Sequence, residues 1–236
     1  NIRVLTRKSS SYWYVTYSFP ITLPVGPINY DDVNFEQLFV RTTIYDELDR
    51  YLNNIEKQHG TFWISSPGGG YGKSTMLNYI ARELYSKLGE YKALPIYMSI
   101  LSPYETLEHA FFKGFLRGFA ELRNGFKLAK TVPPEVQKII KEFSLSENLI
   151  KKFLREKLPL KTIKDLESLY TRTMEFLSKW LEKGVFCKYV LLIDEMDKVK
   201  PEDVLDFFGA NQQRFEDLYQ NYRFVTFISG HKPWVD

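Results

Sequence analysis

A glycine-rich segment, residues 65–75, constrains the fold of this chain more than any other stretch. It reads Ser-Ser-Pro-Gly-Gly-Gly-Tyr-Gly-Lys-Ser-Thr, and its glycines allow backbone N–H groups to turn inward around an anion. Residues 61–65 before it have the character of a short buried strand. Residues 76–88 after it carry apolar side chains at 77, 80, 81, 84 and 88, the spacing of one helix face. This order of strand, glycine loop and helix predicts a phosphate site at the helix N-terminus.

Each residue from 67 to 75 is a candidate for contact with a nucleotide. Lys73 would reach the β- and γ-phosphates, and the Ser74 hydroxyl would hold Mg²⁺. Proline stands six residues before the lysine, where such loops usually carry glycine, so the following glycines must supply the flexibility of the first turn. The alternative is a glycine-rich turn with an incidental lysine. The candidate nucleotide-binding residues are Pro67, Gly68, Gly69, Gly70, Tyr71, Gly72, Lys73, Ser74 and Thr75.

A second motif, Lys-Tyr-Val-Leu-Leu-Ile-Asp-Glu-Met-Asp, spans residues 188–197. The apolar run 189–193 indicates a buried parallel strand. Asp194 and Glu195 follow at its carboxyl end, where open α/β sheets bind their ligands. The alternative is an ordinary strand with an acidic turn. Asp197 is interpreted as a helix-entry or salt-bridge residue.

A third strand is predicted over residues 222–230, one helix (about 201–220) after the Asp-Glu strand. It ends in the polar residues Ser229, Gly230 and His231. A Ser-Gly turn after a strand needs no function, so a purely structural role remains open for this end.

The three motifs together resemble the P-loop NTPases of the additional-strand, catalytic-glutamate division. Within it they look closest to AAA+ and STAND-like ATPases, of the origin-recognition and archaeal types, over residues 39–231. The resemblance implies an α/β fold with a parallel sheet sandwiched by helices, and binding of ATP with Mg²⁺. Asp194 would then hold the Mg²⁺ shell with Ser74, and Glu195 would polarise the attacking water. Ser229, or else His231, would be the sensor 1 residue.

Arg41 is a further candidate for nucleotide contact. In AAA+ and STAND-type ATPases a short motif before the first core helix packs near the adenine, and Phe39-Val40-Arg41 takes that place here. A surface charge is the alternative for Arg41. The helix that follows is predicted over 43–58, capped by Thr42 or Thr43 and ended by Gly60. ATP is favoured over GTP because the sequence carries no Asn-Lys-x-Asp guanine signature.

The expected organisation is an N-terminal extension, residues 1–38, followed by an ATPase core, residues 39–236. The extension is partly extended, with a strand near 12–19, and the core is incomplete because the helical lid of AAA+ proteins does not follow. A strand over 94–100 leads into a helix that starts at the capping box Ser102-Pro103-Tyr104-Glu105. An enlarged helical insertion, about 125–184, separates this second strand from the Asp-Glu strand.

A basic group in the insertion is the candidate surface for double-stranded DNA. The net charge of +3 is too small to demonstrate nucleic-acid binding by itself. A solvated helix face is the preferred alternative for the group, and homo-oligomers would form through parts outside this chain. Its members are Lys151, Lys152, Arg155, Lys157, Lys161 and Lys164.

Two composition features bear on location. The single cysteine excludes an internal disulfide, which suits a reducing compartment, so a cytoplasmic location is expected. No apolar run reaches the ~18 residues of a membrane span.

Three functions remain open from the sequence. The first is an ATPase that drives a switch or motor, with DNA as a candidate substrate. The second is a nucleotide-dependent binding module with negligible turnover that recruits a protein or DNA. The third is an interaction domain with a degenerate site, which the intact Lys73, Ser74, Asp194 and Glu195 disfavour.

Overall fold

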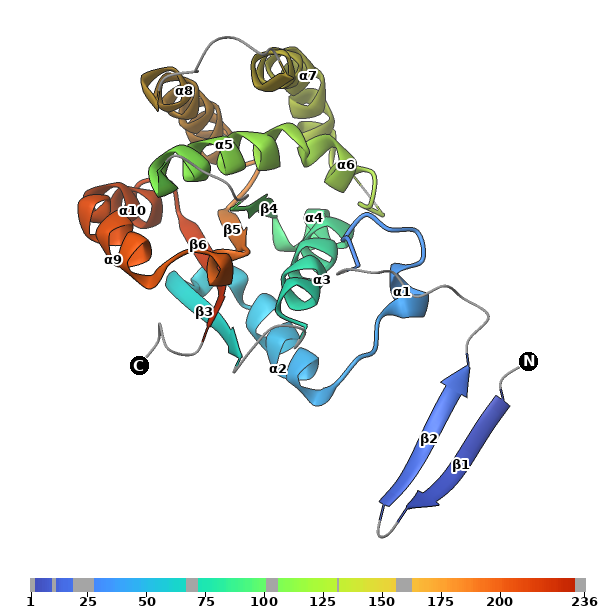
Figure 1. Ribbon diagram of the computed structural model, residues 1–236. Helices are drawn as coiled ribbons and strands as arrows, with labels where there is room; N and C mark the ends of the chain where they lie inside the picture. Colours follow the sequence, from blue (N-terminus) through green and yellow to red (C-terminus); the bar gives the residue numbers. More distant parts are fainter. Residues whose placement is uncertain are drawn as a thin grey trace.

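The computed structural model describes residues 3–9, 12–18, 28–66, 72–100, 106–130, 132–155 and 163–231 (Figure 1). Its strands are β1 (Arg3–Ser9), β2 (Tyr12–Ser18), β3 (Gly60–Ser66), β4 (Ala93–Ser99), β5 (Lys188–Asp194) and β6 (Phe224–His231). Its α-helices are α1 (Phe35–Leu38), α2 (Thr43–Leu52), α3 (Lys73–Ser86), α4 (Leu88–Tyr91), α5 (Leu107–Ala120), α6 (Leu122–Phe126), α7 (Pro134–Arg155), α8 (Ile163–Glu182), α9 (Pro201–Ala210) and α10 (Gln212–Gln220). Two 3₁₀ helices are η1 (Ile55–Lys57) and η2 (Met196–Lys198).

Four of the described strands form an all-parallel sheet in the order β3-β6-β5-β4. Every residue of β5 is buried. A strand covered on both faces needs apolar side chains at successive positions, and this accounts for its unbroken apolar run. The register pairs Ser99 of β4 with Asp194, and Ile193 with Ile228 of β6. The carboxyl ends of these strands therefore share one edge, and the α/β fold with a parallel sheet is confirmed.

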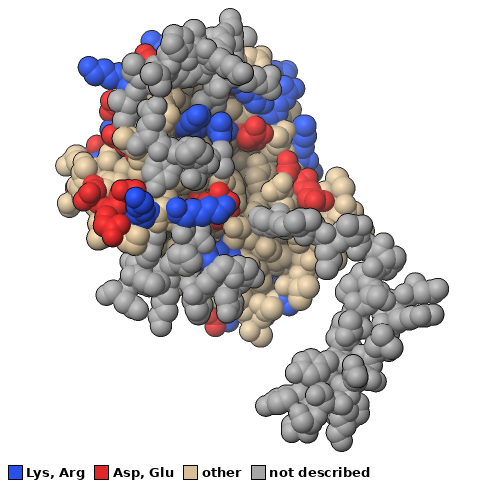
Figure 2. Space-filling model, in the orientation of Figure 1, with Lys and Arg blue, Asp and Glu red and all other residues tan. Residues whose placement is uncertain are grey.

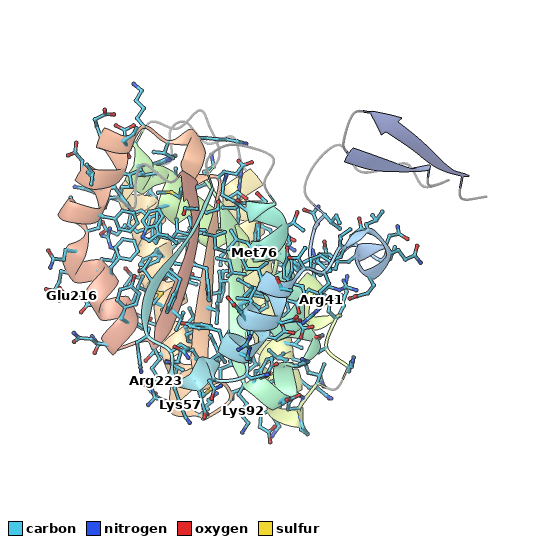
Figure 3. The ribbon with its side chains drawn as sticks, turned by 90° about the horizontal axis from the view of Figure 1, so that it is seen from below. Arg41, Lys57, Met76, Lys92, Glu216 and Arg223 are labelled. Atoms are coloured by element: carbon cyan, nitrogen blue, oxygen red, sulfur yellow. The ribbon has the colours of Figure 1, made fainter. Side chains whose placement is uncertain are left out.

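Helices cover both faces of the sheet. Successive side chains of a strand point to opposite faces of the sheet. In β3 the ring of Phe62 accordingly packs on Tyr51 of α2, and the ring of Trp63 packs on Phe208 of α9. Figure 3 shows the resulting layers edge-on, with Glu216 of α10 on one side of the sheet and Met76 of α3 on the other. The helices α7 and α8 pack outside α5 and supply the helical layer expected between β4 and β5 (Figure 1).

The helix α5 starts later than the sequence suggests. It begins at Leu107, because Thr106 is its N-cap and the Thr106 hydroxyl accepts from the backbone N–H of His109 at 3.1 Å. The expected capping box, residues 102–105, lies outside the described residues. The aromatic stripe of this helix is core, as expected, and its members are Phe111, Phe112, Phe115 and Phe119.

Two other helix boundaries differ from expectation. The helix expected over 43–58 ends at Leu52, and a separate 3₁₀ turn, η1, follows from Ile55. Gly60, with a φ of 92°, opens β3 and does not end the helix. The helix expected over 201–220 is divided into α9 and α10 at Asn211. The Asn211 side chain donates to the Phe207 carbonyl at 2.9 Å, and its backbone leaves the helical region.

The N-terminal part of the chain has two described pieces. β1 and β2 form an antiparallel hairpin, which confirms the strand expected near 12–19. Residues 28–38, which the sequence assigns to the extension, pack on α3, where Ile28 and Phe35 are buried against Tyr79.

Candidate functional site

The helix α3 begins where the glycine-rich loop ends. Gly72 is its N-cap and has a φ of 78°, a left-handed conformation that favours glycine. Lys73 follows as a buried residue, 7% exposed, and Ser74 comes next. The predicted contacts of Pro67, Gly68, Gly69, Gly70 and Tyr71 lie outside the described residues, whereas Thr75 is half-buried in the first turn of α3.

Asp194, at the carboxyl end of β5, brings the three sequence motifs together. It is 4% exposed. The Ser74 hydroxyl donates to Asp194 Oδ1 at 2.9 Å across 120 positions of sequence. The Ser229 hydroxyl, on β6, donates to the same oxygen at 2.7 Å. The predicted Mg²⁺ residues and the first sensor candidate therefore meet at one carboxylate, while the His231 side chain lies outside the described residues.

Glu195 forms the turn directly after β5. Its φ is 66°, and its backbone N–H donates to Asp194 Oδ1 at 2.8 Å and to Ser229 Oγ at 3.1 Å. Its carboxylate accepts from the ammonium of Lys198, on η2, at 2.5 Å. The side chain of Glu195 is 29% exposed, so the predicted catalytic carboxylate lies at the border between the buried network and solvent.

Two residues that the sequence did not single out belong to this network. The Tyr97 hydroxyl, from β4, donates to Asp194 Oδ2 at 2.6 Å. Burial and the Asp194 carboxylate raise the pKa of Tyr97 far above its usual range, so the hydroxyl stays a donor at neutral pH. Asn78, 2% exposed, donates to the Ser74 carbonyl at 2.8 Å and to the Tyr97 hydroxyl at 3.2 Å. Both residues carry a signal in the sequence. Tyr97 places a polar hydroxyl within an apolar strand, and Asn78 places a polar amide within an apolar helix face.

The oxygen atoms at this edge suit a hard divalent cation. Ser74 Oγ donates its proton to Asp194 and keeps its lone pairs for a cation. Mg²⁺ is usually bound by one or two carboxylates together with substrate phosphates and water. In the part of the chain that the structure describes, no cluster of three or more His, Cys, Asp or Glu side chains could hold a metal. Ser74 and Asp194 therefore fit Mg²⁺ only together with a phosphate ligand.

Arg41 is not joined to this network in the described contacts. Its guanidinium donates to Asp46 at 2.7 Å, to Asp49 at 2.6 Å and to the Tyr79 hydroxyl at 2.9 Å. Figure 3 shows Arg41 beside α2, the helix that supplies both carboxylates. These bonds tie residue 41 to α2 and α3, and a nucleotide contact would have to compete with them.

The basic group of α7 and α8 is described only in part. The Lys151 ammonium pairs with the carboxylate of Glu147, a buried residue on the same helix, and Lys164 is exposed. The side chains of Lys152 and Arg155, and residues Lys157 and Lys161, lie outside the described set. On the face shown in Figure 2, described Lys and Arg side chains lie among Asp and Glu side chains.

None of the described helices is long and apolar enough to cross a membrane. Comparisons of the chain with models of protein families, with curated proteins and with solved structures gave no match.

Proposed function

We propose that this chain binds ATP with Mg²⁺ at the carboxyl edge of its sheet and hydrolyses it, as a P-loop ATPase of the AAA+ and STAND-like kind. One observation carries the proposal. Asp194 accepts hydrogen bonds from both Ser74 and Ser229, at 2.9 and 2.7 Å.

Two features make this convergence informative. The sequence selects these three residues from three separate motifs, each for a role around the same phosphate and ion. The strand order supports the same conclusion, because β6 lies between β3 and β5. This order sets the end of β6, with Ser229, beside the ends of both β3, which precedes the glycine-rich loop, and β5, which carries Asp194.

Each residue then has a task that its chemistry allows. Lys73 places a positive charge at the β- and γ-phosphates, and Ser74 and Asp194 hold Mg²⁺, which neutralises phosphate charge when bound. Glu195 accepts the proton of the attacking water. Ser229, whose Oγ accepts from the Glu195 backbone N–H at 3.1 Å, is the proposed sensor of the γ-phosphate.

The first test is ATP turnover by the parent protein and by a Lys73→Ala variant. Loss of an electrostatic stabiliser of the transition state lowers kcat by about 10² to 10³-fold. The matched control is Lys57→Ala, at an exposed lysine of η1, which should retain the parent rate. Hydrolysis by Lys73→Ala at the parent rate would refute the assignment.

A second candidate is a nucleotide-dependent binding module with negligible turnover. The pair between Glu195 and Lys198, at 2.5 Å, favours it, because the ammonium occupies a carboxylate oxygen that would otherwise be open to the attacking water. A Glu195→Gln variant separates the two functions. It should accumulate bound ATP if the parent hydrolyses it, and should behave like the parent if the parent only binds.

A DNA contact through the basic group has less support, since Lys151 already pairs with Glu147. Stimulation of ATP turnover by double-stranded DNA that weakens as salt rises would support it. Equal turnover with and without DNA at low salt would remove DNA from the proposal.

A further inference from the structure

The carboxylate of Asp194 is held from two sides. Its Oδ1 accepts from Ser74 and Ser229, the residues that the proposed function assigns to the ion and the phosphate. Its Oδ2 accepts from the Tyr97 hydroxyl at 2.6 Å. Its Oδ1 also accepts from the backbone N–H of Glu195. A carboxylate held at both oxygens cannot rotate freely about its last torsion, so the bond from Tyr97 acts with the donors on Oδ1 to fix where Oδ1 points.

Tyr97 is in turn fixed by its surroundings. It lies on β4, paired in register with Leu192 of the strand that carries Asp194. Its hydroxyl accepts from Asn78 Nδ2 at 3.2 Å. The ring of Tyr30 packs against the Tyr97 ring at 5.9 Å between centroids. The tyrosine therefore reaches the carboxylate from a rigid strand with its own partners in place.

Asn78 links the two sides of the ion site. It lies one helical turn after Ser74 and donates to the Ser74 carbonyl at 2.8 Å. Its Oδ1 accepts from the backbone N–H of Tyr30 at 2.9 Å. A buried amide with all of these bonds satisfied holds its neighbours in one arrangement. The Asn78 amide therefore holds both the first turn of α3 and the hydroxyl of Tyr97 in place.

We propose that Tyr97 and Asn78 are positioning residues of the magnesium site, which keep Asp194 Oδ1 and Ser74 Oγ aligned for the ion. The inference rests on the proposed function. Neither residue touches the nucleotide in this assignment, and both act through Asp194 and Ser74. Removal of either side chain should raise the Mg²⁺ concentration that nucleotide binding requires, and should leave the affinity for nucleotide without Mg²⁺ unchanged.

The test is calorimetric binding of a non-hydrolysable ATP analogue, AMP-PNP, at a series of Mg²⁺ concentrations and in EDTA. Tyr97→Phe removes one hydroxyl and keeps the ring. Loss of a hydrogen bond to a charged acceptor should raise the Mg²⁺ concentration for half-maximal effect about tenfold. Binding in EDTA should match the parent.

The matched control is Tyr189→Phe. The Tyr189 hydroxyl donates to the Leu177 carbonyl at 2.6 Å in the core. Both variants therefore lose a tyrosine hydroxyl that donates inside the protein, and only Tyr97→Phe also loses a bond from Asn78. The control should therefore keep the parent's Mg²⁺ dependence. In a double-mutant cycle, Tyr97→Phe should have a smaller effect on the Mg²⁺ requirement in an Asn78→Ala background, because the two residues act as one unit.

Three outcomes are distinguishable. A shifted Mg²⁺ requirement in Tyr97→Phe, absent from Tyr189→Phe, supports the proposal. A parent that binds AMP-PNP with Mg²⁺, together with a Tyr97→Phe variant of identical Mg²⁺ dependence, overturns this inference alone. A parent that binds no nucleotide with Mg²⁺ overturns the proposed function, and the positioning role with it.

Discussion

Glu195 has a backbone conformation that non-glycine residues rarely adopt, with a φ of 66°. The left-handed region costs such a residue about 1 kcal/mol or more. The conformation turns its N–H toward Asp194 and Ser229, which both accept from it. The strained backbone of Glu195 therefore places its carboxylate beside the buried network.

This strain predicts an order of stability between two variants. Glu195→Gly and Glu195→Ala both remove the carboxylate and its pair with Lys198, but only glycine adopts the left-handed conformation without strain. Glu195→Gly should therefore be more stable than Glu195→Ala by about 1 kcal/mol, measured by urea unfolding. An alanine variant equal to or more stable than the glycine variant would mean that the turn relaxes. Both variants should be inactive in hydrolysis.

The contact between α5 and β4 fixes the strand that carries Tyr97. A Cβ added at Gly118 of α5 would lie 2.2 Å from the Tyr97 carbonyl oxygen, and one at Gly114 would lie 3.2 Å from the Ser99 carbonyl oxygen. At Gly118 the helix therefore approaches the strand backbone more closely than any side chain would allow, whereas at Gly114 the nearest atom to the added Cβ is Met98 Cε, at 2.9 Å. This packing explains two glycines in the middle of a helix, where glycine is otherwise unfavourable.

Two Gly→Ala variants test this close approach of α5 to β4. Gly118→Ala should lower the free energy of unfolding by about 3 kcal/mol, because the new methyl group collides with rigid backbone. Gly209→Ala, on α9, has nothing within 4 Å of the added Cβ and should raise it by about 0.5 kcal/mol. Urea unfolding measures both. A Gly118→Ala variant as stable as the parent would contradict the close approach.

At the scale of the molecule, the segment 28–38 is attached to the helix that begins the candidate site. Arg82 of α3 donates to the carbonyls of Tyr30 at 2.9 Å and Asp32 at 3.2 Å. It also pairs with Glu36 and lies 4.9 Å from the centre of the Phe35 ring. The segment is thus held against Asn78 and Tyr97, and a disturbance there should reach the ion site.

Arg82→Ala tests this link. Without the guanidinium, the amide of Tyr30 should exchange its hydrogen about tenfold faster or more, because its bond to Asn78 opens more often. The Mg²⁺ requirement for AMP-PNP should rise in the same direction as in Tyr97→Phe. Arg50→Ala, at an exposed arginine of α2, is the control. Unchanged exchange at Tyr30 in Arg82→Ala would show that the segment is held by other contacts.

Much of the fold and part of the site could be predicted from the sequence. The strands β3, β4, β5 and β6 follow from apolar runs, and Asp194 and Ser229 follow from their positions at strand ends. Helix boundaries were less accurate, because Thr106 and Asn211 act through side-chain bonds that compete with helix geometry. Tyr97 and Asn78 were missed because their role depends on tertiary contacts across 97 and 19 positions.

Ser74, Asp194 and Ser229 are proposed to form a magnesium–nucleotide site, and the other proposed roles depend on it. The most direct measurement is calorimetric titration of ATP into the parent protein, with Mg²⁺ and with EDTA, repeated with Asp194→Asn. The parent should bind ATP more tightly with Mg²⁺ than with EDTA. Asp194→Asn should lose most of this gain in affinity, since the amide has no charge to offer the ion. Absence of ATP binding by the parent in both buffers would refute the proposed site.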